Sequence, residues 1–271
     1  MKANKYSHIF EGAFYTMFSQ RLFYSLFAIM GIILLGVFFF WPTYLNGTLK
    51  IYNRIYYIII ALLTVWYVIK NKYFYNKHGK FIMLFLVLVL CDLYFYRNYL
   101  ATGINYAGIA ILLPLFITFI TFLHENGKKE IFLLFKKYFA IVMLPSIFIW
   151  GLLILGIEIP YINILPNSNI KIIGGQIYRC YLGISIILTG VNNSLPVDRL
   201  CGIFDEPGVV GTISALLLIA DGISLKKFKK WDQLTILIAG ILSFSTAFYI
   251  MIGLSIFCKI LSLKLELAIV T

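Results

Sequence analysis

One short segment of the chain brings together residues that could bind an anion or transfer a proton. It is the run 199–208, which reads Arg-Leu-Cys-Gly-Ile-Phe-Asp-Glu-Pro-Gly and stands immediately before an apolar stretch. Proline fits the first turn of a helix, and carboxylates are stabilised by the positive end of the helix dipole. One interpretation is therefore structural, with Asp205 and Glu206 capping a helix that begins at Pro207.

The same segment also suits a phosphate group. The N–H groups at a helix N-terminus bind anions, and a guanidinium group can grip two phosphate oxygens at once. Arg199 precedes the expected helix start closely enough to take part in such a site. The residues alone leave the helix-cap and phosphate interpretations open.

Other residues that could take part in chemistry give weaker evidence of a site. Cys180 and Cys201 could form a disulfide in an oxidising compartment, but we expect them to pack separately as small apolar residues. The three histidines, at positions 8, 78 and 124, lie at segment ends and cannot assemble a metal site. The sequence shows no Walker loop, Rossmann glycine pattern or nucleophile elbow. We therefore expect neither a metal nor a cofactor.

The composition indicates a membrane protein. Of 271 residues, 61% are hydrophobic, 17% aromatic and 13% charged, and the mean hydropathy is +0.92. A soluble domain carries about 25% charged residues, so a soluble, disordered or coiled-coil chain is excluded. The formal net charge of +12 would suggest nucleic-acid binding, but the basic residues cluster between apolar segments. We expect the lipid bilayer as a partner and no nucleic acid.

Apolar stretches long enough to cross ~30 Å of hydrocarbon predict about seven transmembrane helices. They are residues 22–42, 53–69, 81–99, 104–123, 138–157, 208–225 and 234–258. Basic residues concentrate on alternate connections, so the positive-inside rule places the N-terminus in the cytoplasm. The expected fold class is an all-α, polytopic integral membrane protein.

One long connection separates the fifth and sixth expected spans. Within it, residues 170–187 are rich in isoleucine and tyrosine around Gly174 and Gly175, which predicts a β-hairpin. The expected organisation has three parts. Five membrane helices occupy 1–157, a small extracytoplasmic loop subdomain occupies 158–206, and two membrane helices occupy 207–271.

The motif at 199–208 resembles the bacterial O-antigen and capsular polysaccharide polymerase family, in which such a segment enters a membrane helix after a long outside loop. The runs 178–183 (Tyr-Arg-Cys-Tyr-Leu-Gly) and 243–246 (Ser-Phe-Ser-Thr) are similar to the family's pattern as well. The resemblance extends over residues 160–255, and its specific part is the ten-residue motif.

This resemblance implies polymerisation of polyprenyl-diphosphate-linked oligosaccharide repeat units into surface polysaccharide, outside the bacterial cytoplasmic (inner) membrane. It implies that Arg199 and Arg179 hold the donor diphosphate. Glu206 or Asp205 would then accept the proton of the acceptor hydroxyl. The expected substrates are a lipid-linked glycan donor and acceptor. The expected protein partners are a flippase and a chain-length regulator of the same pathway.

Three alternatives stay open from the sequence. An O-antigen ligase would pass the finished glycan to another acceptor. A polytopic transporter or channel would line its path with Asp92, Arg97 and Asp221, although the chain shows no symmetry between two halves. Because family members usually carry more spans, an inactive truncated remnant is the third alternative.

Overall fold

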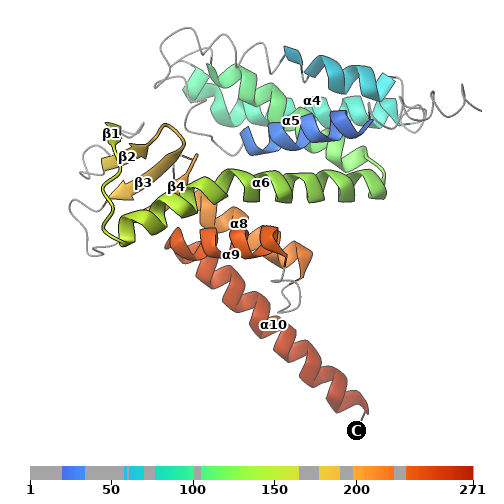
Figure 1. The fold of residues 1–271 in the computed structure, drawn as a ribbon. Helices are drawn as coiled ribbons and strands as arrows, with labels where there is room; N and C mark the ends of the chain where they lie inside the picture. The colour runs from blue at the N-terminus through green and yellow to red at the C-terminus, as the bar shows by residue number, and fades with distance from the viewer. Residues whose placement is uncertain are drawn as a thin grey trace, which may run out of the picture. The chain divides into compact units, whose positions relative to one another are not determined.

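A computed structural model describes residues 20–33, 58–59, 61–69, 77–100, 105–164, 177–189, 198–204, 206–222 and 230–270, with side chains described outside 92–112 and 263–270. The chain divides into two compact units, and the boundary lies inside helix α6 (Glu125–Ile154), between Phe135 and Lys136. We call the part up to Phe135 unit 1 and the part from Lys136 unit 2. Figure 1 labels their elements.

Within the described residues of unit 1, all regular secondary structure is helical. It contains the helix Gln20–Ile33, a helical segment at 61–69, α4 (His78–Leu100), α5 (Asn105–Phe122) and the start of α6. Its core is aromatic, because the apolar faces of these helices carry large rings. Phe23 stacks on Tyr67 with 4.5 Å between ring centroids, and Phe27 lies 4.4 Å from Phe119.

Unit 2 combines a small sheet with three further helices. These are α8 (Pro207–Asp221), α9 (Trp231–Leu242) and α10 (Thr246–Val270), and α8 packs against both others and against the last strand. The approach of α8 is close at Gly211, where an added Cβ would lie 2.3 Å from the Cβ of Ser245. A glycine is therefore required at this helix contact.

The sheet is antiparallel and follows chain order (Figure 1). Its strands are β1 (Tyr161–Ile164), β2 (Ile177–Tyr181), β3 (Ser185–Thr189) and β4 (Arg199–Gly202). Every residue of β3 is buried, so both faces of the sheet are covered at this strand. Two residues with positive φ, Leu182 (51°) and Gly183 (70°), turn the chain between β2 and β3.

The prediction of an all-α chain with a single hairpin is wrong, because four strands form a sheet. The turn of the β2–β3 hairpin uses Leu182 and Gly183, whereas the sequence suggested Gly174 and Gly175, which lie outside the described residues. The fourth strand, β4, comes from the motif at 199–208. The sequence offered no reason to pair it with the distant hairpin.

The prediction of seven membrane-spanning helices is also wrong. Among the residues whose side chains the structure describes, only α6 is long and apolar enough to cross a membrane, and the other helices contribute apolar segments of 10–17 residues there. Hydropathy measures how apolar a segment is, so it cannot show where the helical backbone of that segment is interrupted. The expected span 234–258 is in fact α9 and α10, interrupted at Phe244, whose φ of 46° cannot continue a helix.

Candidate functional site

A cavity of about 860 Å³ lies in unit 2, where the end of α6 meets the sheet. This volume is within the range of ~300–1,000 Å³ that is usual for small-molecule sites. Apolar residues of the α6 end form part of its wall. Three charged and two aromatic side chains also line it, namely Glu158, Tyr161, Arg179, Tyr181 and Asp198.

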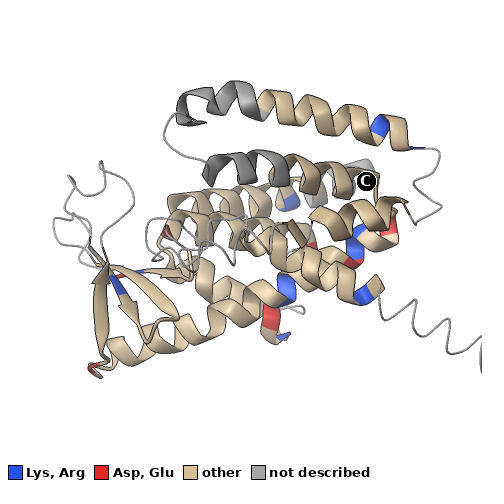
Figure 2. Ribbon diagram, turned by 90° about the horizontal axis from the view of Figure 1, so that it is seen from above, with Lys and Arg blue, Asp and Glu red and all other residues tan. Residues whose placement is uncertain are grey.

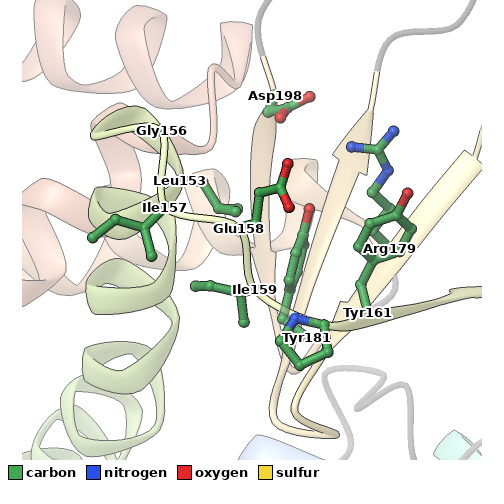
Figure 3. Close-up of a pocket in the computed structure, with 10 residues that line it drawn as sticks. Leu153, Gly156, Ile157, Glu158, Ile159, Tyr161, Arg179, Tyr181 and Asp198 are labelled. Atoms are coloured by element: carbon green, nitrogen blue, oxygen red, sulfur yellow. The ribbon is translucent and has the colours of Figure 1, made fainter.

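The strand register explains why three of these side chains share one face of the sheet. Tyr161 of β1 pairs with Tyr181 of β2, and Asn163 pairs with Arg179. Side chains alternate along a strand, and directly paired residues lie on the same side. Tyr161, Arg179 and Tyr181 therefore project together into the cavity (Figure 3).

Loops bring the two carboxylates to the same place. After α6 ends, Gly156 adopts a positive φ of 76° and the chain turns, which places Glu158 on the cavity wall. Asp198 precedes β4, and its backbone carbonyl accepts a hydrogen bond from the indole Nε1 of Trp150, at 3.1 Å. Figure 3 shows the polar ends of Glu158, Arg179 and both tyrosines on one side of the cavity, near Asp198.

Arg179 is the central group of this cavity. Its guanidinium carbon lies 4.7 Å from the centroid of the Tyr161 ring, a cation–π geometry, and the group also hydrogen-bonds the Tyr181 side chain. The two tyrosine rings are 5.5 Å apart. Both contacts hold the guanidinium in one orientation.

The protonation states follow from these contacts. Burial alone lowers the pKa of Arg179, but the hydrogen bond to Tyr181 and the influence of Tyr161, Tyr181 and Asp198 outweigh it, so the net shift is upward. Burial raises the pKa of Tyr181, and the neighbouring guanidinium only partly opposes this. Arg179 is therefore a cation at physiological pH, and Tyr181 is a neutral hydroxyl.

A buried apolar cluster supports the inner wall of the cavity. Ile149 of α6 packs with Tyr181 and Ile187 in one buried cluster, and Trp150, Leu153 and Ile159 surround it. Because the Tyr181 ring is part of this core, its hydroxyl has a fixed position at the cavity surface. The cavity thus offers one cation, two carboxylates and two aromatic rings on a rigid support, which suits a hydroxyl-rich ligand with local negative charge.

The structure does not bring Arg199 to this site. Arg179 shares its sheet face with Ile187 and Leu200, its partners across β3 and β4. Arg199 pairs with Leu188, which belongs to the opposite face. The two arginines that the resemblance assigns to one diphosphate therefore project from opposite faces of the sheet.

Arg199 instead contacts the break between α9 and α10. Its Nε donates to the carbonyl of Ser243 at 3.2 Å, and its Nη2 donates to the carbonyl of Phe244 at 3.1 Å. Both carbonyls lie where the helical hydrogen-bond ladder is interrupted, so the guanidinium satisfies acceptors that have lost their helical partners.

The acidic residues of the motif occupy the start of α8. Pro207 is at the first helical position, in agreement with the sequence-based expectation. Glu206 is the N-cap residue, with an extended backbone, but its side chain makes no capping hydrogen bond. Asp205 lies outside the described residues. Glu206 is not among the residues that line the cavity of Arg179.

Cysteine and metal chemistry add little to the site. Cys180 and Cys201 are buried and not bridged, and burial raises the pKa of the Cys180 thiol. Among the described residues, no group of three or more histidine, cysteine or acidic side chains is arranged to hold a metal ion.

A cluster of buried charges was not foreseen from the sequence. Lys136 of α6 lies 2.7 Å from an Asp221 carboxylate oxygen and 2.9 Å from one of Asp232. Gln233 also donates from its side-chain amide to Asp221. From the sequence, Asp221 was named as a residue that could line the path of a transporter or channel. One feature of the sequence could have suggested the cluster. An acid, Asp221, ends one apolar helix, and a second acid, Asp232, lies in the first turn of the next.

No protein-family model, curated protein or solved structure matches this chain. The resemblance to polysaccharide polymerases therefore depends on the motif residues themselves. The function that it implies is a proposal.

Proposed function

We propose that this chain binds a lipid-linked glycan in the cavity of Arg179 and takes part in extending polyprenyl-diphosphate-linked oligosaccharides outside the bacterial cytoplasmic membrane. The observation that carries the proposal is the position of Arg179, fixed by Tyr161 and Tyr181 beside two carboxylates in a cavity of about 860 Å³. The polymerase resemblance supplies the substrate class, and of the residues that it assigns, Arg179 lines this cavity.

The cavity chemistry fits a glycan carried on a diphosphate. Sugar rings expose C–H faces that pack on aromatic side chains, and their hydroxyls donate to carboxylates such as Glu158 and Asp198. A guanidinium is suited to two phosphate oxygens because of its planar geometry. Arg179 would hold the diphosphate as charge develops on the leaving group, and Glu158 or Asp198 would accept the proton of the attacking hydroxyl.

The apolar surface supports a membrane location. Large hydrophobic side chains such as Met83, Phe148 and Phe257 are strongly exposed, and charged residues are sparse along the helices (Figure 2). Exposed apolar surface of this extent is costly in water and favourable in a bilayer. These features support a membrane location, with α6 as the candidate spanning helix.

Charge along α6 supports an outside location for the cavity. The first part of the helix carries Lys128, Lys129, Lys136 and Lys137, and the apolar part 138–154 follows. The positive-inside rule favours the cytoplasm for the basic part. The end of α6, which leads into the cavity, would then face outwards.

The test is complementation of a bacterial strain that lacks its own polymerase. We expect the unmodified chain to restore long surface glycan, and Arg179→Ala to reduce polymerisation about 100-fold, as for other lost transition-state contacts. Arg179→Lys should be impaired less, because it keeps the charge but loses the planar fork. Lys129→Ala changes an exposed cation in unit 1 and is the matched control.

The readouts are glycan chain length on gels and protein abundance in membranes by immunoblot. Normal polymerisation by Arg179→Ala at unchanged abundance would show that this cavity is not the substrate site. Failure of the unmodified chain to lengthen any glycan would contradict the proposed activity.

A further inference from the structure

The charges that line the cavity of Arg179 do not balance. Of the described residues that line it, Arg179 carries the one positive charge, whereas Glu158 and Asp198 carry two negative charges. A diphosphate bound by Arg179 would add more negative charge to the same space, and like charges repel strongly where water is partly excluded. A ligand that fits this cavity therefore brings a positive charge of its own.

The two carboxylates have different surroundings. Asp198 is half-buried just before β4, and its charge acts on both Arg179 and Tyr181. Glu158 is exposed, and within the part of the chain that the structure describes it forms no hydrogen bond or ion pair. Asp198 therefore offsets the charge of Arg179, and Glu158 carries the charge that is left without a partner.

Glu158 faces the same space as the other polar groups of the cavity. It lies two residues after Gly156, where the chain turns at the end of α6. Figure 3 shows its carboxylate on the side of the cavity to which the polar ends of Arg179 and Tyr181 point. The Tyr181 hydroxyl can accept a hydrogen bond. A carboxylate and a hydroxyl oxygen together suit an ammonium group, which has three N–H donors and no acceptor.

A metal ion fits this cavity less well than an ammonium group does. Calcium and magnesium ions take six or more oxygen ligands in their usual sites. The lining offers two carboxylates, and no group of three or more histidine, cysteine or acidic side chains is arranged to hold a metal ion in the described segments. The positive charge is therefore best supplied by the organic ligand itself.

We propose that the cavity recognises an amino sugar phosphate, with the phosphate on Arg179 and the protonated amine on Glu158. The inference rests on the proposed function and deepens it, because it names the class of sugar that the lipid-linked glycan carries next to its diphosphate. Glu158 then binds substrate, and of the two carboxylates Asp198 is left to accept the proton of the attacking hydroxyl.

The test compares two sugar phosphates that differ in one group. Glucosamine 1-phosphate has an ammonium group where glucose 1-phosphate has a hydroxyl. Each is titrated into the purified full-length chain in an uncharged detergent, and binding is followed by ligand-observed NMR. We expect glucosamine 1-phosphate to bind about fivefold more tightly, the upper range for an exposed ion pair. The chain's net charge of +12 repels an ammonium group, so this preference has to come from the cavity itself.

Three variants assign the contacts. Glu158→Gln should remove the preference and leave the affinity for glucose 1-phosphate within about twofold, since the substitution changes an exposed side chain. Arg179→Gln should weaken both probes about tenfold, because it removes the phosphate contact. Glu125→Gln, which changes an exposed acid in unit 1, is the matched control and should behave as the unmodified chain.

Equal binding of the two probes to the unmodified chain would overturn the proposal, and so would a preference that survives Glu158→Gln. A preference that appears only with added magnesium and disappears with a chelator would assign the carboxylates to a metal and overturn it too. If Arg179→Gln weakens both probes although they bind equally, the glycan site stands and the amine contact falls. If neither probe binds, both proposals fail.

Discussion

The ammonium group of Lys136 and the carboxylate of Asp221 lie 2.7 Å apart, although 85 residues separate them in the chain. The Lys136 side chain is only 4% exposed, and Asp221 is 20% exposed. A charge buried this deeply is tolerated only when it is paired. Since Asp232 approaches the same ammonium at 2.9 Å, one lysine joins α6 to the end of α8 and the start of α9.

This arrangement predicts a strong effect of Lys136→Met. The substitution leaves two poorly exposed carboxylates without their cation and should lower the free energy of unfolding by about 3–5 kcal/mol. Lys136→Met/Asp221→Asn should be less destabilised than Lys136→Met alone, because one unpaired charge is removed as well. Thermal unfolding of the detergent-purified protein measures both.

Lys137→Met is the matched control, since Lys137 is adjacent and exposed. It should change stability by less than about 0.5 kcal/mol. If Lys136→Met were as mild as this control, the buried cluster would not stabilise the fold.

Arg199 is predicted to stabilise the break between α9 and α10. Arg199→Ala removes two charged hydrogen bonds to the carbonyls of Ser243 and Phe244 and should cost about 2–3 kcal/mol of stability. Arg199→Lys should lie between Ala and the unmodified protein, because an ammonium cannot reproduce both contacts of the fork. The measurement is thermal unfolding in detergent, together with membrane abundance.

If Arg199 instead holds the donor diphosphate, as the resemblance implies, the Arg199 variants should lose activity and keep their stability. Unchanged stability with loss of glycan lengthening in Arg199→Ala would support a substrate contact. Loss of stability and abundance together would support the structural role.

Gly211 is predicted to tolerate no side chain. An added Cβ would lie 2.3 Å from the Cβ of Ser245 and 2.7 Å from the Oγ of Ser243, so Gly211→Ala should push α8 from the α9–α10 break and cost about 1–3 kcal/mol. Gly208→Ala, in the same helix, meets nothing within 4 Å and should be neutral or stabilise by up to about 1 kcal/mol. The difference between the two melting temperatures tests this close contact, and equal effects would refute it.

Cys180 and Cys201 are predicted to remain reduced and slow to react. Both are buried, and the raised pKa of Cys180 lowers its thiolate fraction near neutral pH. Maleimide should label the exposed Cys91 and Cys258 first in detergent, and the buried pair only after denaturation. A peptide containing a disulfide between residues 180 and 201, detected by mass spectrometry, would contradict this expectation.

Much of the local structure around the candidate site follows from the sequence. Pro207 predicted the first turn of α8, because its fixed φ suits that position and its missing N–H would have no partner there anyway. Strand-forming residues predicted β structure in the long connection, since isoleucine and tyrosine favour strands. These are short-range effects, decided by the residue and its immediate neighbours.

The number of membrane-spanning helices could not be predicted in the same way. Apolar composition measures preference for lipid, but it does not show where the backbone leaves the helical conformation. Phe244 has no sequence feature that forces its positive φ. Arg199, from a distant strand, binds the two carbonyls at this break and so stabilises it.

The sequence by itself determined the apolar character of the chain, the start of α8 and the presence of strands before it. Only the tertiary structure decided that Arg179 and Arg199 project from opposite faces of one sheet and that Lys136 meets Asp221. The physical reason is that the side-chain period of a strand is two residues, so the face of each residue depends on the pairing register. Register and helix packing are set by contacts between residues far apart in the chain, which no local pattern encodes.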